Sequence, residues 1–287
     1  MEEENSKIKI ETKPNTNSLH ILEKGDIFFF YRPKVAKEAA HGESDVQQFY
    51  LFLRPQNSGG GDGSSDGGAQ PQAAAVRYII MGRKRLPEES ERRPFWGFVQ
   101  MVTKQIQHLK DALKGEIYET TTKGQRHLPD ARAAGEGVYS ILSHNRGSNQ
   151  THTHLVYKLE FPVEGNVEGS GPQEALNIAR EASFIIQIKN PDHHVQSGFR
   201  GLDKKRKAVY PARLQGIFGH RRYHPADPPD FLDYEGCEFL LISASDDLEQ
   251  ELGLEIGSEG AGECSDLVNM LGESTVATQP LFEGTWI

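Results

Sequence analysis

Residues 26–32 of the chain read DIFFFYR, in which an acidic and a basic residue enclose five apolar or aromatic ones. The side chains of a strand alternate between its two faces, so an unbroken apolar run makes both faces apolar. Such a strand is stable in the middle of a sheet that is covered on both sides. We therefore expect residues 26–32 to form a central, buried strand.

Six further segments have the composition or the alternation of strands. The clearest is 152–161, HTHLVYKLEF, where Leu155, Tyr157, Leu159 and Phe161 fall on one face. The others are residues 48–54, 76–81, 137–142, 183–189 and 237–243. So many short strands favour a mostly antiparallel sheet.

Two segments are predicted to be helices. Residues 95–113 carry apolar side chains at spacings of three and four, between Pro94 and Gly115, which is typical of one face of an amphipathic helix. Residues 211–218 are a shorter candidate that ends at Gly219. The predicted fold class is therefore α+β, which here means a strand-rich, mostly antiparallel sheet with two main helices.

The order of these segments suggests an internal repeat. Three strands precede each helix, which would make a duplicated β-β-β-α unit. Two pairs of segments are alike, since QFYLFLRP from Gln48 resembles HLVYKLEFP from His154, and RYIIMGRKRLP from Arg77 resembles SFIIQIKNP from Ser183. The matches are short, so a chance likeness is an open alternative.

Composition separates a body from the segments around it. We expect a single domain over residues 19–245, which could consist of two halves, 19–115 and 116–245. Residues 1–18 are polar and are expected to be disordered, and the Gly/Ser-rich residues 57–75 form a flexible insertion.

The charge of the chain depends strongly on position. The 32 Lys and Arg and the 41 Asp and Glu residues give a net charge of -9. Residues 76–225 nevertheless hold 24 basic and 15 acidic residues, net +9, whereas residues 226–287 hold 15 acidic residues and no Lys or Arg. The acidic tail, residues 246–287, ends in PLFEGTWI, whose apolar side chains would bury area if they docked on the body or on a partner. The tail could therefore mask the basic body or simply clasp it.

Within the body, the positive charge occurs in blocks at the ends of predicted strands and helices. Arginine side chains there suit a phosphate or a carboxylate. The residues that we predict to bind an anion are Arg83, Lys84, Arg85, His127, Arg132, Arg221, Arg222 and His224. The simpler alternative is that these are solvated surface charges.

A further basic block, KKRK at 204–207, could act as a nuclear import signal. Nucleic-acid binding would require aromatic side chains among the basic ones. Tyr210 and Tyr223 lie close in sequence, but Phe218 is needed by the predicted helix face, and no known nucleic-acid-binding module is present. Nucleic acid is therefore a less favoured partner than another anionic ligand or a protein.

Two hypotheses about function follow. The first is a non-catalytic binding or interaction protein that presents a basic surface to an anionic partner. The second is an enzyme that acts on a phosphorylated or carboxylated small molecule, with a site lined by His127, Arg132, Arg221, Arg222 and His224. Convergence of these five side chains in one pocket would favour the enzyme, and a broad basic face would favour binding. If they are scattered over separate faces, both site proposals fail.

The chain has no recognisable catalytic or cofactor motif, so no catalytic residue, cofactor or metal is predicted. His152 and His154 would share one face of a strand, as two metal ligands must, but no local spacing fixes a third ligand. Two cysteines in unlike surroundings, Cys237 and Cys264, favour a reducing compartment. With no apolar run of about 18 residues and no signal-peptide pattern, we expect a cytoplasmic or nuclear protein without a membrane partner.

Several runs of the sequence resemble an uncharacterised family of plant proteins with bacterial relatives. These runs are KGDIFFFYRPKV, MGRKRLP, THTHLVYKLEFP, FIIQIKNP, PADPPDFLDYEGCEFLLISASDD and PLFEGTW. The resemblance covers nearly the whole chain outside the Gly-rich loop, and it implies a soluble plant protein. Some members carry a BTB/POZ label, which a strand-dominated chain does not support. The resemblance implies no catalytic residue.

Overall fold

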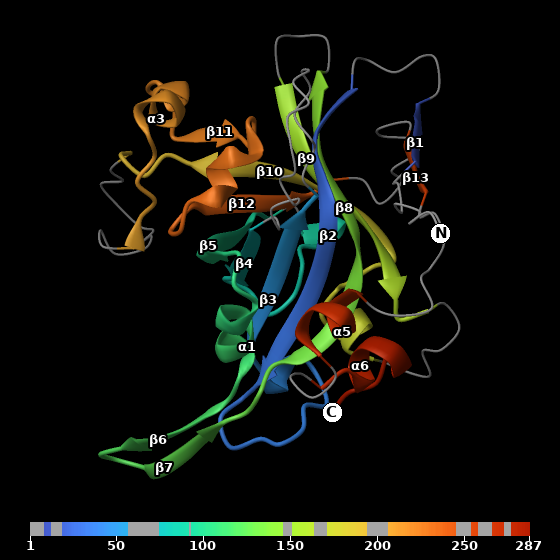
Figure 1. The fold of residues 1–287 in the computed structure, drawn as a ribbon, viewed down its shortest axis with the longest axis vertical. Coiled ribbons are helices and arrows are strands. Elements are labelled where there is room, and N and C mark those ends of the chain that lie inside the picture. Colours follow the sequence, from blue (N-terminus) through green and yellow to red (C-terminus); the bar gives the residue numbers. More distant parts are fainter. Residues whose placement is uncertain are drawn as a thin grey trace, which may run out of the picture.

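The computed structural model describes the main sheet, most of its connections and the last residues of the chain (Figure 1). The described residues are 9–12, 19–56, 75–91, 93–145, 151–163, 171–193, 206–244, 254–257, 266–272 and 277–287. Nearly all of the predicted insertion at 57–75, most of the segment 1–18 and several stretches of the acidic tail lie outside these residues. Lys204 and Lys205 of the KKRK block also lie outside them.

Strands dominate the described structure, and its helices are short. The strands are β1 (Lys9–Thr12), β2 (Leu19–Pro33), β3 (Val46–Pro55), β4 (Val76–Met81), β5 (Phe95–Thr103), β6 (Glu116–Thr120), β7 (Gly124–Leu128), β8 (Arg132–Asn145), β9 (Thr151–Phe161), β10 (Glu181–Lys189), β11 (Tyr223–Pro225), β12 (Glu238–Ser243) and β13 (Leu254–Gly257). The α-helices are α1 (Ile106–Leu113), α2 (Pro172–Ala175), α3 (Ala212–Phe218), α5 (Asp266–Leu271) and α6 (Gln279–Glu283). Every predicted strand is present, and α3 confirms the shorter predicted helix. Among the described residues, no helix has the length and apolar character needed to cross a membrane.

The main sheet closes on itself. Its strand order is β11-β10-β12-β5-β4-β3-β2-β8-β9, and β9 also pairs with β10. All of these pairings are antiparallel. Eight strands therefore form a closed antiparallel barrel, and β11 extends it beside β10. The predicted α+β class is wrong, because the sheet buries its inner face by closing on itself and carries only short helices on its outside.

The predicted helix at residues 95–113 is the main error of secondary structure. Phe95–Thr103 forms strand β5, and only Ile106–Leu113 is helical. Side chains alternate along the first part of β5, with Phe95 buried in the barrel and Trp96 half-buried on the outer face. Over so short a run, apolar spacings of three and four are compatible with a helix or with a strand. The aromatic and β-branched residues of this segment favour the strand.

The barrel consists of two four-stranded units. β2, β3, β4 and β5 are neighbours in chain order, and so are β8, β9, β10 and β12. The first strands of the two units, β2 and β8, pair with each other, and so do the last strands, β5 and β12. The predicted β-β-β-α repeat is therefore wrong in its fourth element, which is a strand in both units. The two sequence likenesses fall on equivalent strands, β3 with β9 and β4 with β10.

Strand β2 is buried on both faces, as its sequence predicts. Phe29 lies in the barrel interior, where its ring centroid is 5.0 Å from that of Tyr157. Phe30 faces outward, 4.7 Å from the ring of Phe52, in an outer cluster that includes Leu113 of α1. The apolar core therefore has two layers, one inside the barrel and one between the barrel and its helices.

An ion-pair network fills the barrel interior near the start of β2. Arg77 is 2% exposed, and it donates hydrogen bonds to the Glu23 carboxylate at 2.6 and 2.8 Å and to Asp233 at 2.7 Å. The Tyr139 hydroxyl donates to the same Glu23 carboxylate at 2.7 Å. Burial alone would lower the pKa of Arg77, but the Glu23 and Asp233 carboxylates raise it above its ordinary value. The buried charge is therefore fully paired.

The end of the chain packs against the opposite part of the interior, near the end of β2. The Trp286 ring meets the Tyr31 ring edge-on, with centroids 5.1 Å apart, and it packs against the interior cluster. The Tyr31 hydroxyl donates to the main-chain oxygen of Ile287 at 3.3 Å, and the Ala40 amide donates to the same oxygen at 3.2 Å. These last residues are thus docked on the body.

Helices α5 and α6 cover the outside of the seam between β2 and β8. Leu267, Leu271 and Leu281 join the outer cluster there, and the two helices lie against the lower part of the barrel in Figure 1. The buried carboxylate of Glu136, in β8, accepts hydrogen bonds from the amides of Asp266 and Leu267 at the start of α5, the shortest at 2.6 Å. This part of the acidic tail therefore acts as a clasp over the β2–β8 seam.

Replacing Glu136 with Gln is expected to lower the free energy of unfolding by about 1–2 kcal/mol, because a neutral amide is a weaker acceptor for the α5 amides. Urea unfolding measures the loss, and faster amide exchange in α5 would locate it. Glu160→Gln is the matched control, because burial and then the Asp26 and Asp266 charges raise the pKa of Glu160. That control should lose no stability, and an equal loss in both variants would contradict the clasp.

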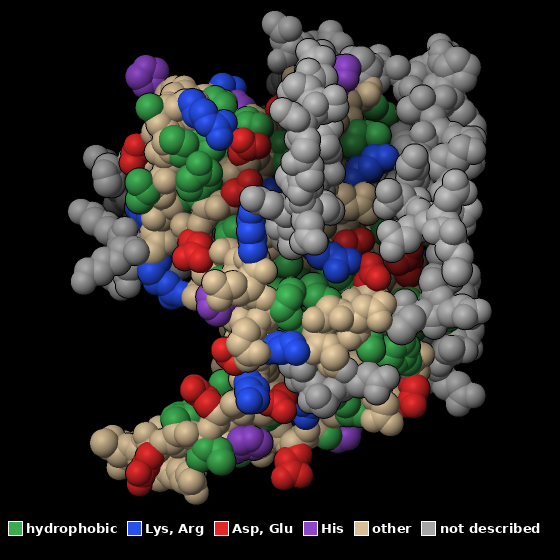
Figure 2. All heavy atoms as spheres, viewed as in Figure 1, with side chains coloured by type: hydrophobic (Ala, Val, Ile, Leu, Met, Phe, Trp, Pro, Cys, Tyr) green, Lys and Arg blue, Asp and Glu red, His purple; other side chains and the backbone are tan. Residues whose placement is uncertain are grey.

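Strands β6 and β7 form a hairpin arm that projects from the body (Figures 1 and 2). The buried guanidinium of Arg32 donates to main-chain oxygens on both sides of its base, among them those of Lys114 and Pro129. Further out, the side chain of Ile117 is 66% exposed. The arm is therefore anchored firmly at its base and exposed along its length.

Candidate functional site

The predicted anion-binding residues lie in three separate parts of the structure. Arg83, Lys84 and Arg85 follow β4, His127 and Arg132 flank the base of the arm, and Arg221, Arg222 and His224 surround the start of β11. The arm lies at the lower left of Figure 1, and β11 lies at the upper left. The five side chains proposed for an enzyme site therefore do not meet in one pocket.

Among the described groups, only one residue of the block after β4 is neutralised. The guanidinium of Arg85 forms ion pairs with the carboxylates of Glu88, Glu91 at 2.6 Å and Glu43 at 3.7 Å. The guanidinium of Arg83 lies 5.8 Å from the centroid of the Phe95 ring. Arg85 is therefore part of a local ion-pair network and is not available to a bound anion.

The two residues at the base of the arm mainly contact backbone. Arg132 donates to the main-chain oxygens of Asp130 at 3.0 Å and of Glu38 at 3.1 Å. His127 is exposed on β7, and its main-chain oxygen accepts the amide of Ala36 at 2.9 Å. These contacts tie the arm to the body.

Of the third group, only Arg222 belongs to a larger arrangement of rings and basic side chains on the outer face of the barrel. Arg221 donates to the main-chain oxygen of Ile217 at 3.2 Å, and the His224 ring packs against Phe218 and Phe231. Three aromatic rings, from β5 and β11, each lie within cation–π distance of a basic side chain. The pairs, from the charged group to the ring centroid, are Lys189 and Trp96 at 5.3 Å, Arg206 and Phe98 at 5.8 Å, and Arg222 and Tyr223 at 5.2 Å. We name these six residues the cation–aromatic face.

The strand register brings these residues together. Phe98 in β5 lies opposite Glu238 in β12, Glu238 forms an ion pair with Lys189 in β10, and Lys189 lies opposite Tyr223 in β11. A row of side chains thus crosses four strands on one side of the sheet. The Trp96 ring belongs to the same side, with its centroid 6.2 Å from that of Tyr223.

The cation–aromatic face lies at the seam between β5 and β12. The clasp covers the other seam between the two units, between β2 and β8. In the two-unit barrel, the β5–β12 seam is the counterpart of the β2–β8 seam. Helices α5 and α6 cover the β2–β8 seam, whereas neither Trp96 nor Phe98 is among the described side chains that join the two apolar clusters. Both rings and that of Tyr223 are half-buried. The face therefore presents three half-buried aromatic residues on one side of the sheet.

The basic side chains of this face are only partly neutralised. Lys189 and Glu238 are both buried and pair with each other. Arg206 donates to the neutral amide of Gln100 at 2.7 Å, and neither Arg206 nor Arg222 has a carboxylate partner among the described residues. The Nε of Arg222 is buried and has no acceptor in the described part of the chain. An anion could therefore satisfy groups that the described fold leaves open.

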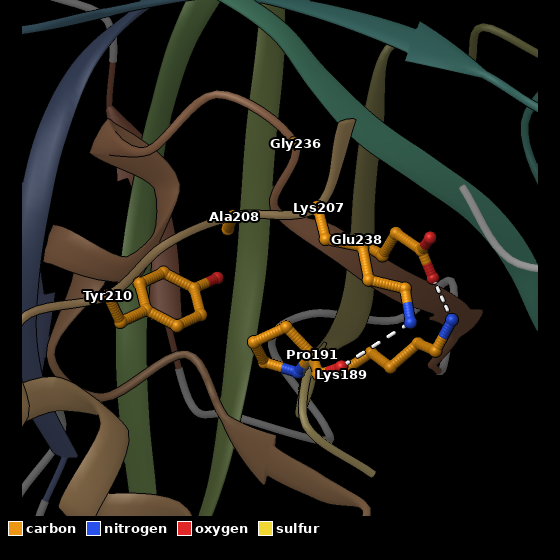
Figure 3. Close-up of a pocket in the computed structure, with 7 residues that line it drawn as sticks. All are labelled: Lys189, Pro191, Lys207, Ala208, Tyr210, Gly236 and Glu238. Carbon is orange, nitrogen blue, oxygen red and sulfur yellow. Dashed lines mark hydrogen bonds and ion pairs between the residues drawn. The ribbon is translucent and has the colours of Figure 1, made fainter. Parts of the chain in front are cut away.

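A small pocket adjoins the face (Figure 3). It is lined by Lys189, Pro191, Lys207, Ala208, Tyr210, Gly236 and Glu238. Figure 3 shows the amines of Lys189 and Lys207 close together, with the Tyr210 ring on the other side, and the Lys207 amine lies 3.5 Å from the Pro191 oxygen. The space open to the centre of a water molecule is about 10 Å³, so the enclosed part of the pocket has room for about one water-sized group.

The titratable groups beside this pocket are poorly suited to catalysis. Burial raises the pKa of Tyr210, and its neighbour Cys237 raises it further, so the hydroxyl stays protonated. Burial raises the pKa of Cys237 to about 12, so this thiol is not a nucleophile at neutral pH. Burial lowers the pKa of His224, because its ring packs against Phe218 and Phe231.

The structure describes no group of three or more side chains that could hold a metal ion, within the residues that it places. His154 is buried, and its Nδ1 lies 3.1 Å from the Ser183 hydroxyl. The ring centroid of His144 is 6.0 Å away. The two histidines therefore lie close together on the outer face of β8 and β9, and His154 has a hydroxyl partner.

Of the three cations of the face, the sequence-based prediction included Arg222 as an anion-binding residue and Arg206 only within the KKRK block, and it missed Lys189. It also missed the two principal rings. Trp96 and Phe98 were assigned to a helix, so they were not connected to the basic segment around Arg222. The signal that could have found them is Gly97, because glycine is unfavourable inside a helix. In the barrel a Cβ at this position would lie 2.5 Å from the Phe239 ring, so glycine makes room for the interior packing.

No family model, curated protein or solved structure matches the chain. The resemblance to plant proteins with bacterial relatives therefore stays a prediction.

Proposed function

We propose that the protein is a non-catalytic binding protein, which holds an anionic partner on the cation–aromatic face. The observation that carries this proposal is the set of three ring–cation pairs on an open seam of the barrel. Arg206 and Arg222 have no carboxylate partner among the described residues, and the Nε of Arg222 has no acceptor there. Separate phosphate, sulfate or carboxylate groups of one polyanion would pair with these guanidinium groups.

The proposed site is a local one and not a broad basic surface. In the view of Figure 2, basic and acidic side chains are interspersed over the described residues, without a large field of either sign. The described helices of the acidic tail lie over the opposite seam, where Glu136 and Arg54 hold α5. They support a clasp and give no support to a mask over the site.

The alternative of an enzyme for a small phosphorylated or carboxylated molecule has less support. The enclosed part of the adjoining pocket has room for about one water-sized group, and its Tyr210 hydroxyl stays protonated. The histidines and arginines proposed for catalysis lie at separate places. A cytoplasmic or nuclear location remains part of the proposal, because a reducing compartment suits the free, buried Cys237.

Binding to heparin, a sulfated polyanion, tests the proposal. The double substitution Arg206→Ala with Arg222→Ala is expected to weaken binding at least tenfold, about 1.4 kcal/mol, because two charge-assisted contacts are lost. The slope of log K against the logarithm of the salt concentration should also become less steep by about two. The measurement is fluorescence polarisation of labelled heparin at two salt concentrations.

The matched control is Arg83→Ala with Lys123→Ala, which removes the same charge from the β4 loop and the exposed arm. It should bind almost as tightly as the unmodified chain. Equal losses in the two double variants would mean that heparin senses only net charge. Failure of the unmodified chain to bind would remove the proposed function.

A further inference from the structure

We propose that the anionic partner of the cation–aromatic face is a single-stranded nucleic acid, whose bases stack on Trp96 and its neighbouring rings. This inference rests on the proposed function, and it adds the chemical class of the partner. The proposed function uses the charges of the three ring–cation pairs, and the inference adds a role for their rings.

The rings offer a stacking platform. Trp96 and Phe98 are two residues apart on β5 and therefore point to the same side of the sheet. The Tyr223 ring reaches them from β11, at 6.2 Å from Trp96 between centroids and tilted by 52°. All three are half-buried, so part of each ring is accessible to solvent. Successive unpaired bases bind to such arrays of rings on a sheet, because every base has a flat aromatic face.

Arg206 and Arg222 now contact aromatic rings, and each could contact a phosphate instead. Arg206 is exposed, lies before α3, and shares its guanidinium only with the neutral Gln100 and the Phe98 ring among the described groups. Arg222 immediately precedes β11. Both side chains can therefore turn toward a phosphate while the strands keep the rings fixed. Lys189 is held in place by Glu238, so it would stay as part of the platform.

This geometry selects single strands over other polyanions. A duplex hides the faces of its bases, and the platform has no helix that could enter a groove. A phosphopeptide or a sulfated polysaccharide offers charge without an array of flat rings, so it would use Arg206 and Arg222 but would gain little from Trp96. The dependence of binding on bases and on Trp96 is therefore the property that separates these partners.

The test compares two labelled oligonucleotides of equal length and charge, an oligouridylate and its abasic analogue, by fluorescence anisotropy with the full chain. The oligouridylate is expected to bind at least tenfold more tightly. Trp96→Leu keeps an apolar side chain on the strand and removes the flat ring, so it should reduce this preference to about twofold or less. Tyr118→Leu, on the exposed arm, is the control and should change neither affinity.

The outcomes separate the two proposals. Equal binding of both oligonucleotides, or tighter binding of heparin with no effect of Trp96→Leu, would keep the anion site and overturn the nucleic-acid inference. No binding of either oligonucleotide or of heparin would overturn both. A melting curve checks that Trp96→Leu is folded, and if it is not, Tyr223→Leu on the edge strand repeats the comparison.

Discussion

Replacing Arg77 with Ala is expected to lower the free energy of unfolding by about 3–5 kcal/mol, the range for removing one partner of a buried ion pair. Arg77 is 2% exposed, and its guanidinium satisfies both oxygens of Glu23 and one of Asp233. Without it, the Tyr139 hydroxyl remains as a hydrogen-bond donor to the Glu23 carboxylate among the described groups inside the barrel. Denaturant unfolding followed by circular dichroism measures the loss.

The companion variants test whether the loss comes from an uncompensated charge. Arg77→Met with Glu23→Gln removes both charges and should restore much of the stability lost in Arg77→Ala. Arg213→Ala, which breaks an exposed ion pair with Asp230, should change stability by less than about 1 kcal/mol. If Arg77→Ala loses no more than Arg213→Ala, the network does not fill the barrel as described.

Phe29→Ala and Phe30→Ala are each expected to lower the free energy of unfolding by about 3–5 kcal/mol. The two positions are adjacent and face opposite sides of β2, and both side chains are 0% exposed. Phe29 packs in the barrel interior, and Phe30 packs in the layer under the helices. Equal and large losses are therefore expected from opposite faces of one strand, measured by urea unfolding.

Ile117→Ala on the arm is the control for these substitutions, and it should change stability by about 0.5 kcal/mol or less. A large loss for Phe29→Ala with a small one for Phe30→Ala would mean that the outer layer of helices is not packed on the barrel. The reverse pattern would contradict the closed interior.

The strands were predictable because their signal is local. The run DIFFFYR predicts burial on both faces, and the structure confirms it for Phe29 and Phe30. The segment 95–113 was predicted wrongly, because apolar spacing alone does not separate a strand from a helix over nine residues, the length of β5. Packing in the barrel favours the strand, because it places Phe95 and Gly97 toward the packed interior.

Closure of the sheet was not predictable from local patterns. It depends on the pairing of β9 with β10 and of β5 with β12, and the second pair joins residues more than a hundred positions apart in the sequence. The weak likeness between segments did fall on equivalent strands, but the repeat was assigned the wrong fourth element. A pairing between distant strands leaves no periodicity in either one.

The candidate site was half visible in the sequence. Charge blocks are easy to find, but their neutralisation by distant acids is not, as Arg85 and its partner Glu43 show. The rings of the face were hidden by the helix prediction for Trp96. Only the fold shows that Arg222 has a neighbouring ring and no carboxylate partner among the described residues.

The most direct test of the binding face uses the two tryptophans of the chain, Trp96 and Trp286. Trp96 lies on the face, and Trp286 packs against Tyr31 at the clasp. Tryptophan emission is recorded during titration with heparin for the unmodified chain, Trp96→Phe and Trp286→Phe. We expect saturable emission changes in the unmodified chain and in Trp286→Phe, and none in Trp96→Phe. A change that survives in Trp96→Phe and disappears in Trp286→Phe would place the anion elsewhere and contradict the proposed site.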